Sequence, residues 1–228
     1  MDWVIRQEGY NREAIADNGN RFLIANGYLG VRGTLDEDGK EELAAVNLAG
    51  IYDRVGEGWR EPLNAPNPLY TAIRLDGKAL RAETARSHRQ ALDYRHGIAW
   101  RETVWPGLTV TSRRFASMDD CHLIACEYTL SASSPLTVEL LAEIDPDIWE
   151  TYGPHYAATD FEHRDDTLLC LAHVQNSEKT VAVGRRCELS HEAEQKETER
   201  GFLYRFQLNP GESATLTRSE EHTSELQS

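Results

Sequence analysis

Hydrophobic residues recur at every second position in this chain, and that alternation limits the possible folds more than any other feature of the sequence. Phe202, Tyr204, Phe206 and Leu208 alternate with polar residues, and the segment from Leu136 to Ile144 repeats the pattern. Successive side chains of a strand point to opposite faces, so a period of two is typical of a strand with one face in the core. We therefore expect strands to carry the core.

Other segments show the same signal. LYTAIRL from Leu69 alternates and is followed by Asp76-Gly77, a dipeptide typical of a type I′ turn. HLIACEYTL from His122 is apolar on both faces, which predicts a strand covered by a second layer. We expect further strands at Ile98–Val104, Leu108–Phe115, Leu168–Val174 and Thr180–Gly184.

Only the segment Ser190–Arg200 has a helix-forming composition. Its apolar content is too low for a packed helix, so we expect a charged hairpin loop there. Strands joined by short polar turns, with no alternation of strands and helices, predict a mostly β protein: one antiparallel sandwich domain.

The formal net charge of −14 argues against nucleic acid and anionic membranes as partners, because both attract clustered Lys and Arg. A local site for a small phosphate remains compatible with that charge. No apolar run approaches the roughly 20 residues of a membrane-spanning helix. The first residues do not resemble a secretory signal, so we expect a cytoplasmic protein.

The four cysteines, Cys121, Cys126, Cys170 and Cys187, form no CxxC pair and have no His at zinc-finger spacing. Three of them lie in apolar, strand-like segments, where Cys behaves as a small hydrophobic residue. We expect buried free thiols, without disulfides and without a metal site.

The end of the chain, Arg218–Ser228, reads RSEEHTSELQS. This string is the translation of a common DNA-sequencing adapter. We therefore expect residues 218–228 to be a non-native tail, residues 1–217 to form the domain, and the natural chain to continue beyond it.

The segment Asn18–Gly39 contains NGYLGVRG at Asn26–Gly33 and then an acidic run. This motif resembles the opening motif of glycoside hydrolase family 65. Four more blocks follow in the order that the family shows, and together the blocks cover most of Trp3–Glu143: LAGIYDR (48–54), PLNAPNPLYTAIRLDG (62–77), ALDYRHGIAWRETVW (91–105) and SRRFASMDDCHLIACEY (112–128).

The resemblance implies an N-terminal β super-sandwich of the galactose mutarotase type, followed by a helical linker, an (α/α)6 barrel and a small C-terminal sheet. The family's phosphorylases cleave α-glucosides such as maltose, trehalose and kojibiose. A general acid protonates the leaving oxygen while inorganic phosphate, the co-substrate, attacks the opposite face of the anomeric carbon. The acid and the phosphate pocket belong to the barrel. We therefore expect a non-catalytic domain without cofactor, whose partner is its own catalytic domain, in an intact enzyme that is a homodimer.

The candidate site residues are Asn26, Tyr28 and Arg32, in the NGYLGVRG motif. The favoured interpretation is structural: Arg32 bridges a turn and Tyr28 packs between layers. The alternative is that this loop faces the catalytic domain and shapes the sugar pocket or the domain interface. The motif glycines, Gly27, Gly30 and Gly33, fit tight turns and close backbone approach better than a phosphate loop.

No other residue group is strongly favoured as a site. The pairs Asp119-Asp120, Asp145-x-Asp147 and Asp165-Asp166 look like solvated loop carboxylates, because adjacent strand residues point to opposite faces. His155, His163 and His173 lack metal-ligand spacing and are expected to be satisfied structural histidines. The aromatic loops around Trp59 and Trp149-x-x-Tyr152 are weaker candidates for stacking on sugar rings.

Two alternative functions remain. A free-standing carbohydrate-binding or mutarotase-like sandwich would need its own ligand groove with a converging His and Glu. A domain of a family 65 α-glucoside hydrolase would differ in residues of the barrel. For residues 1–217 we expect no measurable binding of maltose, trehalose or kojibiose.

Overall fold

The protein is a stack of antiparallel β-sheets in a computed structural model that describes residues 3–164 and 166–226. The largest sheet has nine strands, in the spatial order β1 (Val4–Glu8), β8 (Ser87–Asp93), β9 (Ile98–Trp105), β10 (Leu108–Ala116), β11 (Leu123–Ala132), β18 (Ser213–Leu226), β15 (Lys179–Leu189), β14 (Thr167–Val174) and β13 (Tyr156–Arg164).

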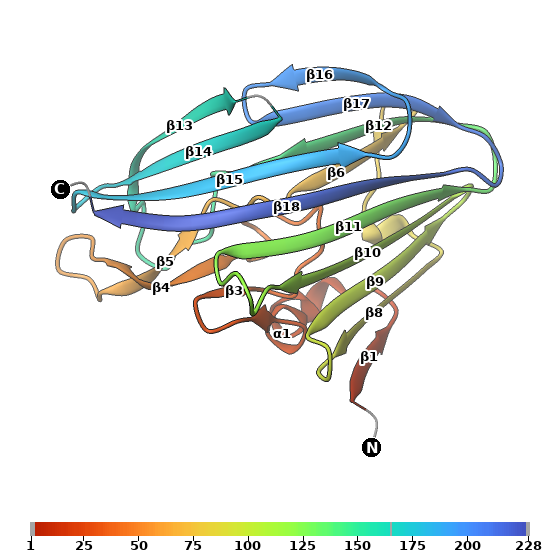
Figure 1. Ribbon diagram of the computed structural model, residues 1–228. Helices are drawn as coiled ribbons and strands as arrows, with labels where there is room; N and C mark the ends of the chain where they lie inside the picture. The colour runs from red at the N-terminus through yellow and green to blue at the C-terminus, as the bar shows by residue number, and fades with distance from the viewer. Residues whose placement is uncertain (1–2, 165, 227–228) are drawn as a thin grey trace.

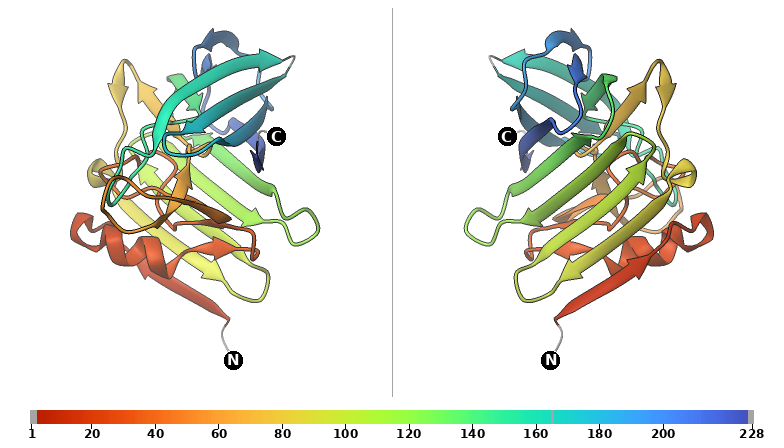
Figure 2. Two further views of the ribbon diagram at one scale, coloured as in Figure 1. Left: turned by 90° about the vertical axis from the view of Figure 1, so that its left-hand side faces the viewer. Right: turned by 90° about the vertical axis from the view of Figure 1, so that its right-hand side faces the viewer.

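Two smaller sheets lie across it (Figure 1). One has five strands, in the order β16 (Glu194–Thr198), β17 (Gly201–Leu208), β12 (Leu136–Glu143), β6 (Thr71–Leu75) and β7 (Lys78–Ala79). The other has four, in the order β2 (Ile24–Ala25), β3 (Leu29–Val31), β4 (Val46–Asp53) and β5 (Glu61–Ala65). Figure 2 shows the layers from the side, with the nine-stranded sheet twisting from β8 and β9 to β13 and β14. The architecture is the mostly β, antiparallel sandwich that the alternation predicts.

Two apolar clusters fill the space between the layers. One is centred on the four-stranded sheet and includes Leu29, Leu48 and Leu63. The other lies under the five-stranded sheet and includes Val138, Leu140 and all four alternating residues of β17. The residues that point into the core are therefore the alternating hydrophobic residues predicted from the sequence.

The short-range predictions are confirmed at the strands and at one turn. The strands expected from Ile98, Leu108, Leu168 and Thr180 correspond to β9, β10, β14 and β15. Asp76 and Gly77 both have positive φ, at 49° and 77°, as a type I′ turn requires. They connect β6 to β7, where Leu75 pairs with Lys78.

Three expectations need correction. β11 buries only one face and leaves the other half-buried, because no layer covers the outer face of the nine-stranded sheet there. Ser190–Arg200 is not wholly a loop, since β16 pairs with β17 as a charged edge strand. The short α-helix α1 (Ile15–Arg21) was not predicted. It follows the 3-10 turn η1 (Arg12–Ala14), where Asn11 Oδ1 accepts a hydrogen bond from Glu13 N. A second 3-10 turn, η2, spans Ala82–Thr84.

The last strand, β18, runs into the segment that we expect to derive from an adapter. It pairs with β11 on one side and with β15 on the other, and Arg218 and Glu220 are buried. Residues 218–226 thus belong to the sheet in this structure, and their origin stays a prediction.

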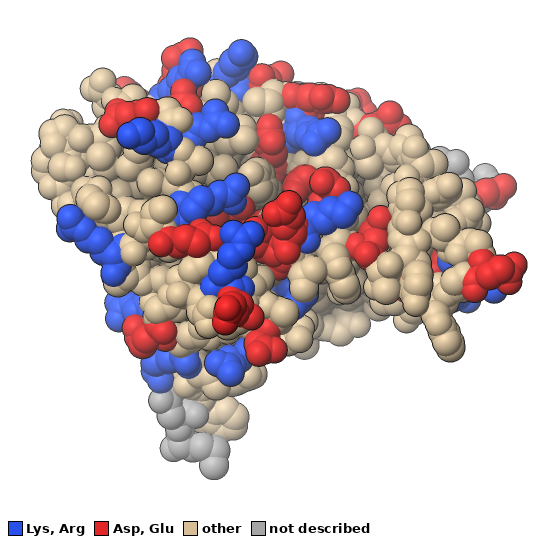
Figure 3. Space-filling view, turned by 180° about the vertical axis from the view of Figure 1, so that it is seen from behind, with Lys and Arg blue, Asp and Glu red and all other residues tan. Residues whose placement is uncertain are grey.

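The four cysteines are all free thiols; Cys126 and Cys170 are buried as expected, whereas Cys121 is exposed. Among the described residues, no helix is long and apolar enough to cross a membrane. Acidic and basic side chains are interspersed over the face in Figure 3, without a broad area of one sign.

Candidate functional site

Asn26 fixes the turn that opens the NGYLGVRG motif. Its Oδ1 accepts hydrogen bonds from Tyr28 N at 3.0 Å and Leu29 N at 2.9 Å. Its Nδ2 donates to the carbonyl oxygens of Ser117, at 2.6 Å, and Cys121, at 3.0 Å. The amide therefore ties the motif to the loop between β10 and β11, and Gly27 within the turn has a φ of 91°.

Tyr28 packs its ring against His122, edge to face, with the ring centroids 4.5 Å apart. It also contacts the apolar cluster of the four-stranded sheet. Such aromatic contacts stabilise local packing. Tyr28 therefore connects the motif to the end of the nine-stranded sheet.

Arg32 joins two backbone segments. Its guanidinium donates to Ala16 O at 2.7 Å and to Leu43 O at 3.3 Å. The side chain lies against Gly19 of α1, where a Cβ atom would come within 2.6 Å of Arg32 Nε. Burial lowers the pKa of Arg32. The contacts of Asn26, Tyr28 and Arg32 match the structural interpretation, and a role at a sugar pocket or domain interface stays a prediction.

The structure brings together a second group, around His155. Its Nδ1 lies 3.1 Å from Asp53 Oδ2, and its Nε2 forms a short hydrogen bond with Glu61 Oε1. Asp53 also accepts from Asn176 Nδ2 at 3.1 Å. Asp53 ends β4 and Glu61 begins β5, so the imidazole ties the loop 145–155 to the β4–β5 hairpin, which projects at the left of Figure 1.

The electrostatics of this group are mutually stabilising. Burial alone would lower the pKa of His155, yet its hydrogen bonds with Glu61 and Asp53 raise the pKa above its usual value. Burial alone would raise the pKa of Asp53 and of Glu61, yet their bonds with His155 lower both. The arrangement favours an imidazolium between two carboxylates.

His155 and Glu61 are the converging His and Glu that a mutarotase-like site would need. However, His155 is only 1% exposed and both ring nitrogens already have carboxylate partners. A sugar cannot reach the imidazole in this arrangement. The group therefore positions loops and does not form an open acid–base site.

The aromatic loops named in the sequence meet beside this group. Tyr152 N donates to Glu61 Oε1 at 2.9 Å, and the Tyr152 ring lies against Gly58 of the β4–β5 hairpin. Trp59 is 77% exposed on the same hairpin. Each loop was predicted separately from the sequence. The two loops are joined through Glu61 and His155, and His155 was expected only to be a satisfied structural histidine.

A third group, buried between the layers, was missed entirely. Asp36 Oδ2 lies 3.1 Å from Arg101 Nε, and Asp36 Oδ1 lies 2.8 Å from Arg218 Nη2. Ser112 Oγ donates to Asp36 Oδ2 at 2.9 Å. Burial alone would raise the pKa of Asp36, yet Arg101, Arg218 and Arg114 hold it well below its usual range.

Two neighbouring carboxylates in the same loop, Glu37 and Asp38, have different partners from Asp36. Glu37 forms an ion pair with Arg101, with Oε2 2.7 Å from Nη2. Asp38 is buried, accepts from Leu35 N at 2.7 Å and has a pKa raised to about 8 by burial and by Glu37. A raised carboxyl pKa can mark a general acid. Asp38 nevertheless lies in a loop beside Glu37 and Glu42, and a raised pKa alone does not assign it a catalytic role.

The predicted carboxylate pairs are local structural elements. Asp120 Oδ1 accepts from His122 N at 3.0 Å, and Asp145 Oδ1 accepts from Asp147 N at 3.0 Å. Asp166 pairs with Arg186, whereas Asp165 lies outside the described residues.

Of the other two histidines, His173 is satisfied as expected, whereas the buried Nδ1 of His163 has no hydrogen-bond partner among the described residues. His163 hydrogen-bonds to Thr198 O, and His173 to Thr180 and Asp160. Within the described part of the chain, no group of three or more His, Cys, Asp or Glu side chains is arranged to hold a metal ion.

Comparison with known proteins identifies the family of this chain. The model for the N-terminal domain of glycosyl hydrolase family 65 matches residues 5–220. The chain is 48% identical over 168 residues to nigerose phosphorylase of Lachnoclostridium phytofermentans, covering 71% of this chain and 22% of that protein. It is 31% identical over 212 residues to kojibiose phosphorylase of Escherichia coli, covering 85% of this chain and 27% of that protein.

A solved structure, described as a putative kojibiose phosphorylase from the human microbiome, superposes with a TM-score of 0.86 at 15% identity. The superposition covers 99% of this chain and 33% of the other. The chain thus spans a third or less of the length of these relatives. The sequence match and the shared architecture agree: this chain belongs to glycosyl hydrolase family 65 and carries its N-terminal domain.

Proposed function

We propose that this chain is the N-terminal, non-catalytic domain of an inverting disaccharide phosphorylase that acts on α-glucosides. The observation that carries the proposal is the family match over residues 5–220, joined to relatives named as phosphorylases that are more than three times longer. In the proposed enzyme, the carboxylic acid and the phosphate site lie on a catalytic domain outside this chain.

The buried charged groups support a scaffold role for this domain. Asp36 is neutralised by arginines, and His155 is closed off by its own carboxylate partners. An inverting reaction needs a protonated acid in a sugar pocket and room for phosphate on the opposite face of the sugar. Among the described residues, neither group meets that requirement.

The test compares residues 1–228 with an extended chain in which residues 1–217 are followed by the natural continuation of the protein. Each is incubated with inorganic phosphate and either nigerose or kojibiose, and glucose 1-phosphate is measured. We expect release only from the extended chain. Release by residues 1–228 alone would contradict the non-catalytic role. Release of free glucose without phosphate, and no glucose 1-phosphate, would instead identify the family 65 hydrolase alternative.

The proposal also includes a cytoplasmic location and a homodimeric intact enzyme. Cell fractionation and analytical ultracentrifugation of the extended chain test these two points. A secreted or strictly monomeric extended chain would contradict them.

A further inference from the structure

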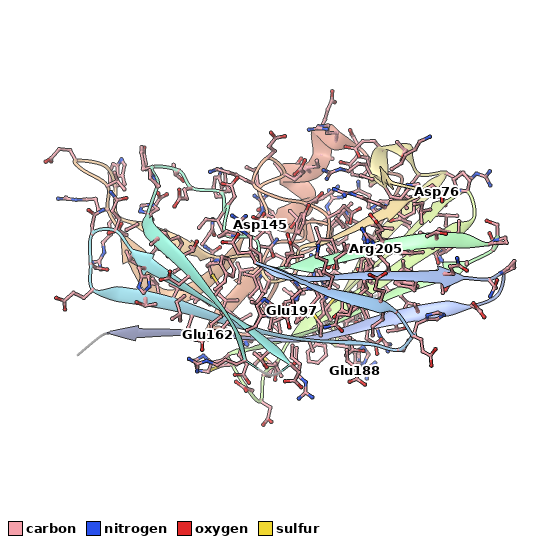
Figure 4. All side chains as sticks on the ribbon, turned by 90° about the horizontal axis from the view of Figure 1, so that it is seen from above. Asp76, Asp145, Glu162, Glu188, Glu197 and Arg205 are labelled. Atoms are coloured by element: carbon pink, nitrogen blue, oxygen red, sulfur yellow. The ribbon has the colours of Figure 1, made fainter. Side chains whose placement is uncertain are left out.

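A groove of about 360 Å³ lies between the loop 145–155 and the edge strand β13. Its walls come from three separate segments of the chain: Lys40, the stretch 146–159 that runs from the loop into β13, and Arg200 from the β16–β17 turn. The volume falls in the range of small-molecule sites. The loop begins at Asp145, labelled in Figure 4.

The charges in the groove cancel. Lys40 and Arg200 are cationic, whereas Asp147 and Glu150 are anionic. A site for phosphate would need an excess of positive charge, and a site for a cation would need an excess of carboxylates. Four side chains of balanced charge instead offer donors and acceptors side by side, which suits a neutral ligand rich in hydroxyl groups.

The polar groups are available to a ligand. Lys40 Nζ and Asp147 Oδ1 are 2.9 Å apart, but their side chains are 48% and 70% exposed. An exposed ion pair of this kind contributes little to stability, so its partners can turn to hydroxyl groups at small cost. Glu150 is held more firmly, because its Oε1 accepts from His155 N at 2.8 Å.

Apart from Thr159, the uncharged side chains that line the groove are mainly apolar. The Tyr156 ring is fixed by its hydroxyl, which donates to Asn64 O at 2.9 Å. The rings of Pro146 and Pro154 line the same groove. Pyranose rings present carbon–hydrogen faces to such surfaces and hydroxyl groups to the polar side chains around them.

We infer that this groove binds a neutral sugar, an α-linked glucose disaccharide. The choice of an α-glucoside rests on the proposed function; the choice of a neutral sugar rests on the groove alone. The inference replaces our expectation that residues 1–217 bind no disaccharide. The groove could not be predicted from the sequence, because Lys40, the stretch 146–159 and Arg200 come together only in the folded chain.

The test is an NMR titration of residues 1–228 with nigerose and with kojibiose, up to about 50 mM. We expect shifts confined to the groove and a Kd on the order of 1 mM. Asp147→Ala and Arg200→Ala should each weaken binding about fivefold, the effect of losing one hydrogen-bonding group. Both residues are exposed, so thermal melts should stay unchanged.

The matched control is the pair Glu139 and Arg205, which also lie 2.9 Å apart but outside the groove, on the five-stranded sheet. Arg205 is labelled in Figure 4. Glu139→Ala and Arg205→Ala should leave the Kd unchanged. The inference is wrong if neither sugar shifts the groove resonances, or if the control variants weaken binding as much as Asp147→Ala. If the extended chain catalyses phosphorolysis but the groove binds neither sugar, only the groove inference is wrong. If the groove binds a sugar but the extended chain catalyses no phosphorolysis, only the proposed function is wrong.

Discussion

Two buried charged regions of this domain, around Asp36 and around His155, neutralise their carboxylates in different ways. Around Asp36, a carboxylate between the layers is matched by arginines from strands of the nine-stranded sheet. Around His155, two carboxylates near the loops share one imidazole. Arginine stays protonated at any physiological pH, whereas histidine titrates near neutrality. The first region is therefore a permanent charge pair, and the second depends on pH.

The comparison teaches where adjustable parts of the domain lie. The Asp36 region sits in the sandwich itself, in contact with β9, β10 and β18. The His155 region joins the β4–β5 hairpin to the loop that lines the groove. Changes in protonation at His155 can thus affect the loops while the sandwich stays intact.

The largest expected effect is at Asp36. Asp36→Ala should lower the free energy of unfolding by about 3–5 kcal/mol, because it leaves Arg101 and Arg218 buried without their shared carboxylate. Urea denaturation at pH 7 measures the change. Glu139→Ala, which breaks an exposed pair, is the control and should cost under about 1 kcal/mol. If both variants lost the same free energy of unfolding, the buried Asp36 region would be no more important for stability than an exposed ion pair.

A smaller effect is expected at His155. His155→Ala should lower the free energy of unfolding by about 2–3 kcal/mol, because Asp53 and Glu61 lose their hydrogen-bond partner. The hydrogen exchange of backbone amides in the β4–β5 hairpin and the loop 145–155 should accelerate more than that of β10 and β11. Uniform acceleration over all strands would show that His155 does not act locally.

Asp38 sharpens the contrast with Asp36, two residues away. Its pKa of about 8 means that the folded state holds a proton at pH 7 that the unfolded state releases. The contribution of Asp38 to the free energy of unfolding therefore falls as pH rises from the ordinary carboxyl pKa toward 8. Asp38→Asn should remove this loss and raise the free energy of unfolding by about 1 kcal/mol at pH 8. A destabilised variant would contradict the raised pKa.

The smallest effect is the pH dependence of the His155 region. A raised pKa of His155 gives stability that is fully present below the unfolded value near 6.5 and is lost as pH rises through the folded pKa. The lowered pKa values of Asp53 and Glu61 give stability that is lost only at acidic pH. Denaturation at pH 6 and pH 8 should show a decline in the wild type that is smaller in His155→Gln. Identical slopes in both proteins would place the pH dependence elsewhere.

Much of the fold followed from local patterns. The alternation at 202–208 and the Asp76-Gly77 turn depend on neighbouring residues, and the structure has both. Asn26 could be recognised by its motif, and its Oδ1 bonds to nearby backbone groups, but the distant partners of its Nδ2, Ser117 O and Cys121 O, could not be predicted. The helix α1 was missed because it is short and has no repeated apolar stripe; its place depends on Arg32, which lies across Gly19.

The sequence by itself determined which residues face inward, where the turn at Asp76-Gly77 falls and which family the motif resembles, because these depend on residues that are close along the chain. Only the tertiary structure decided the partners of the buried charges and the walls of the groove. His155 lies 102 positions from Asp53, and Arg218 lies 182 positions from Asp36. A period of two tells that a side chain points inward, but the order of strands decides what it meets there.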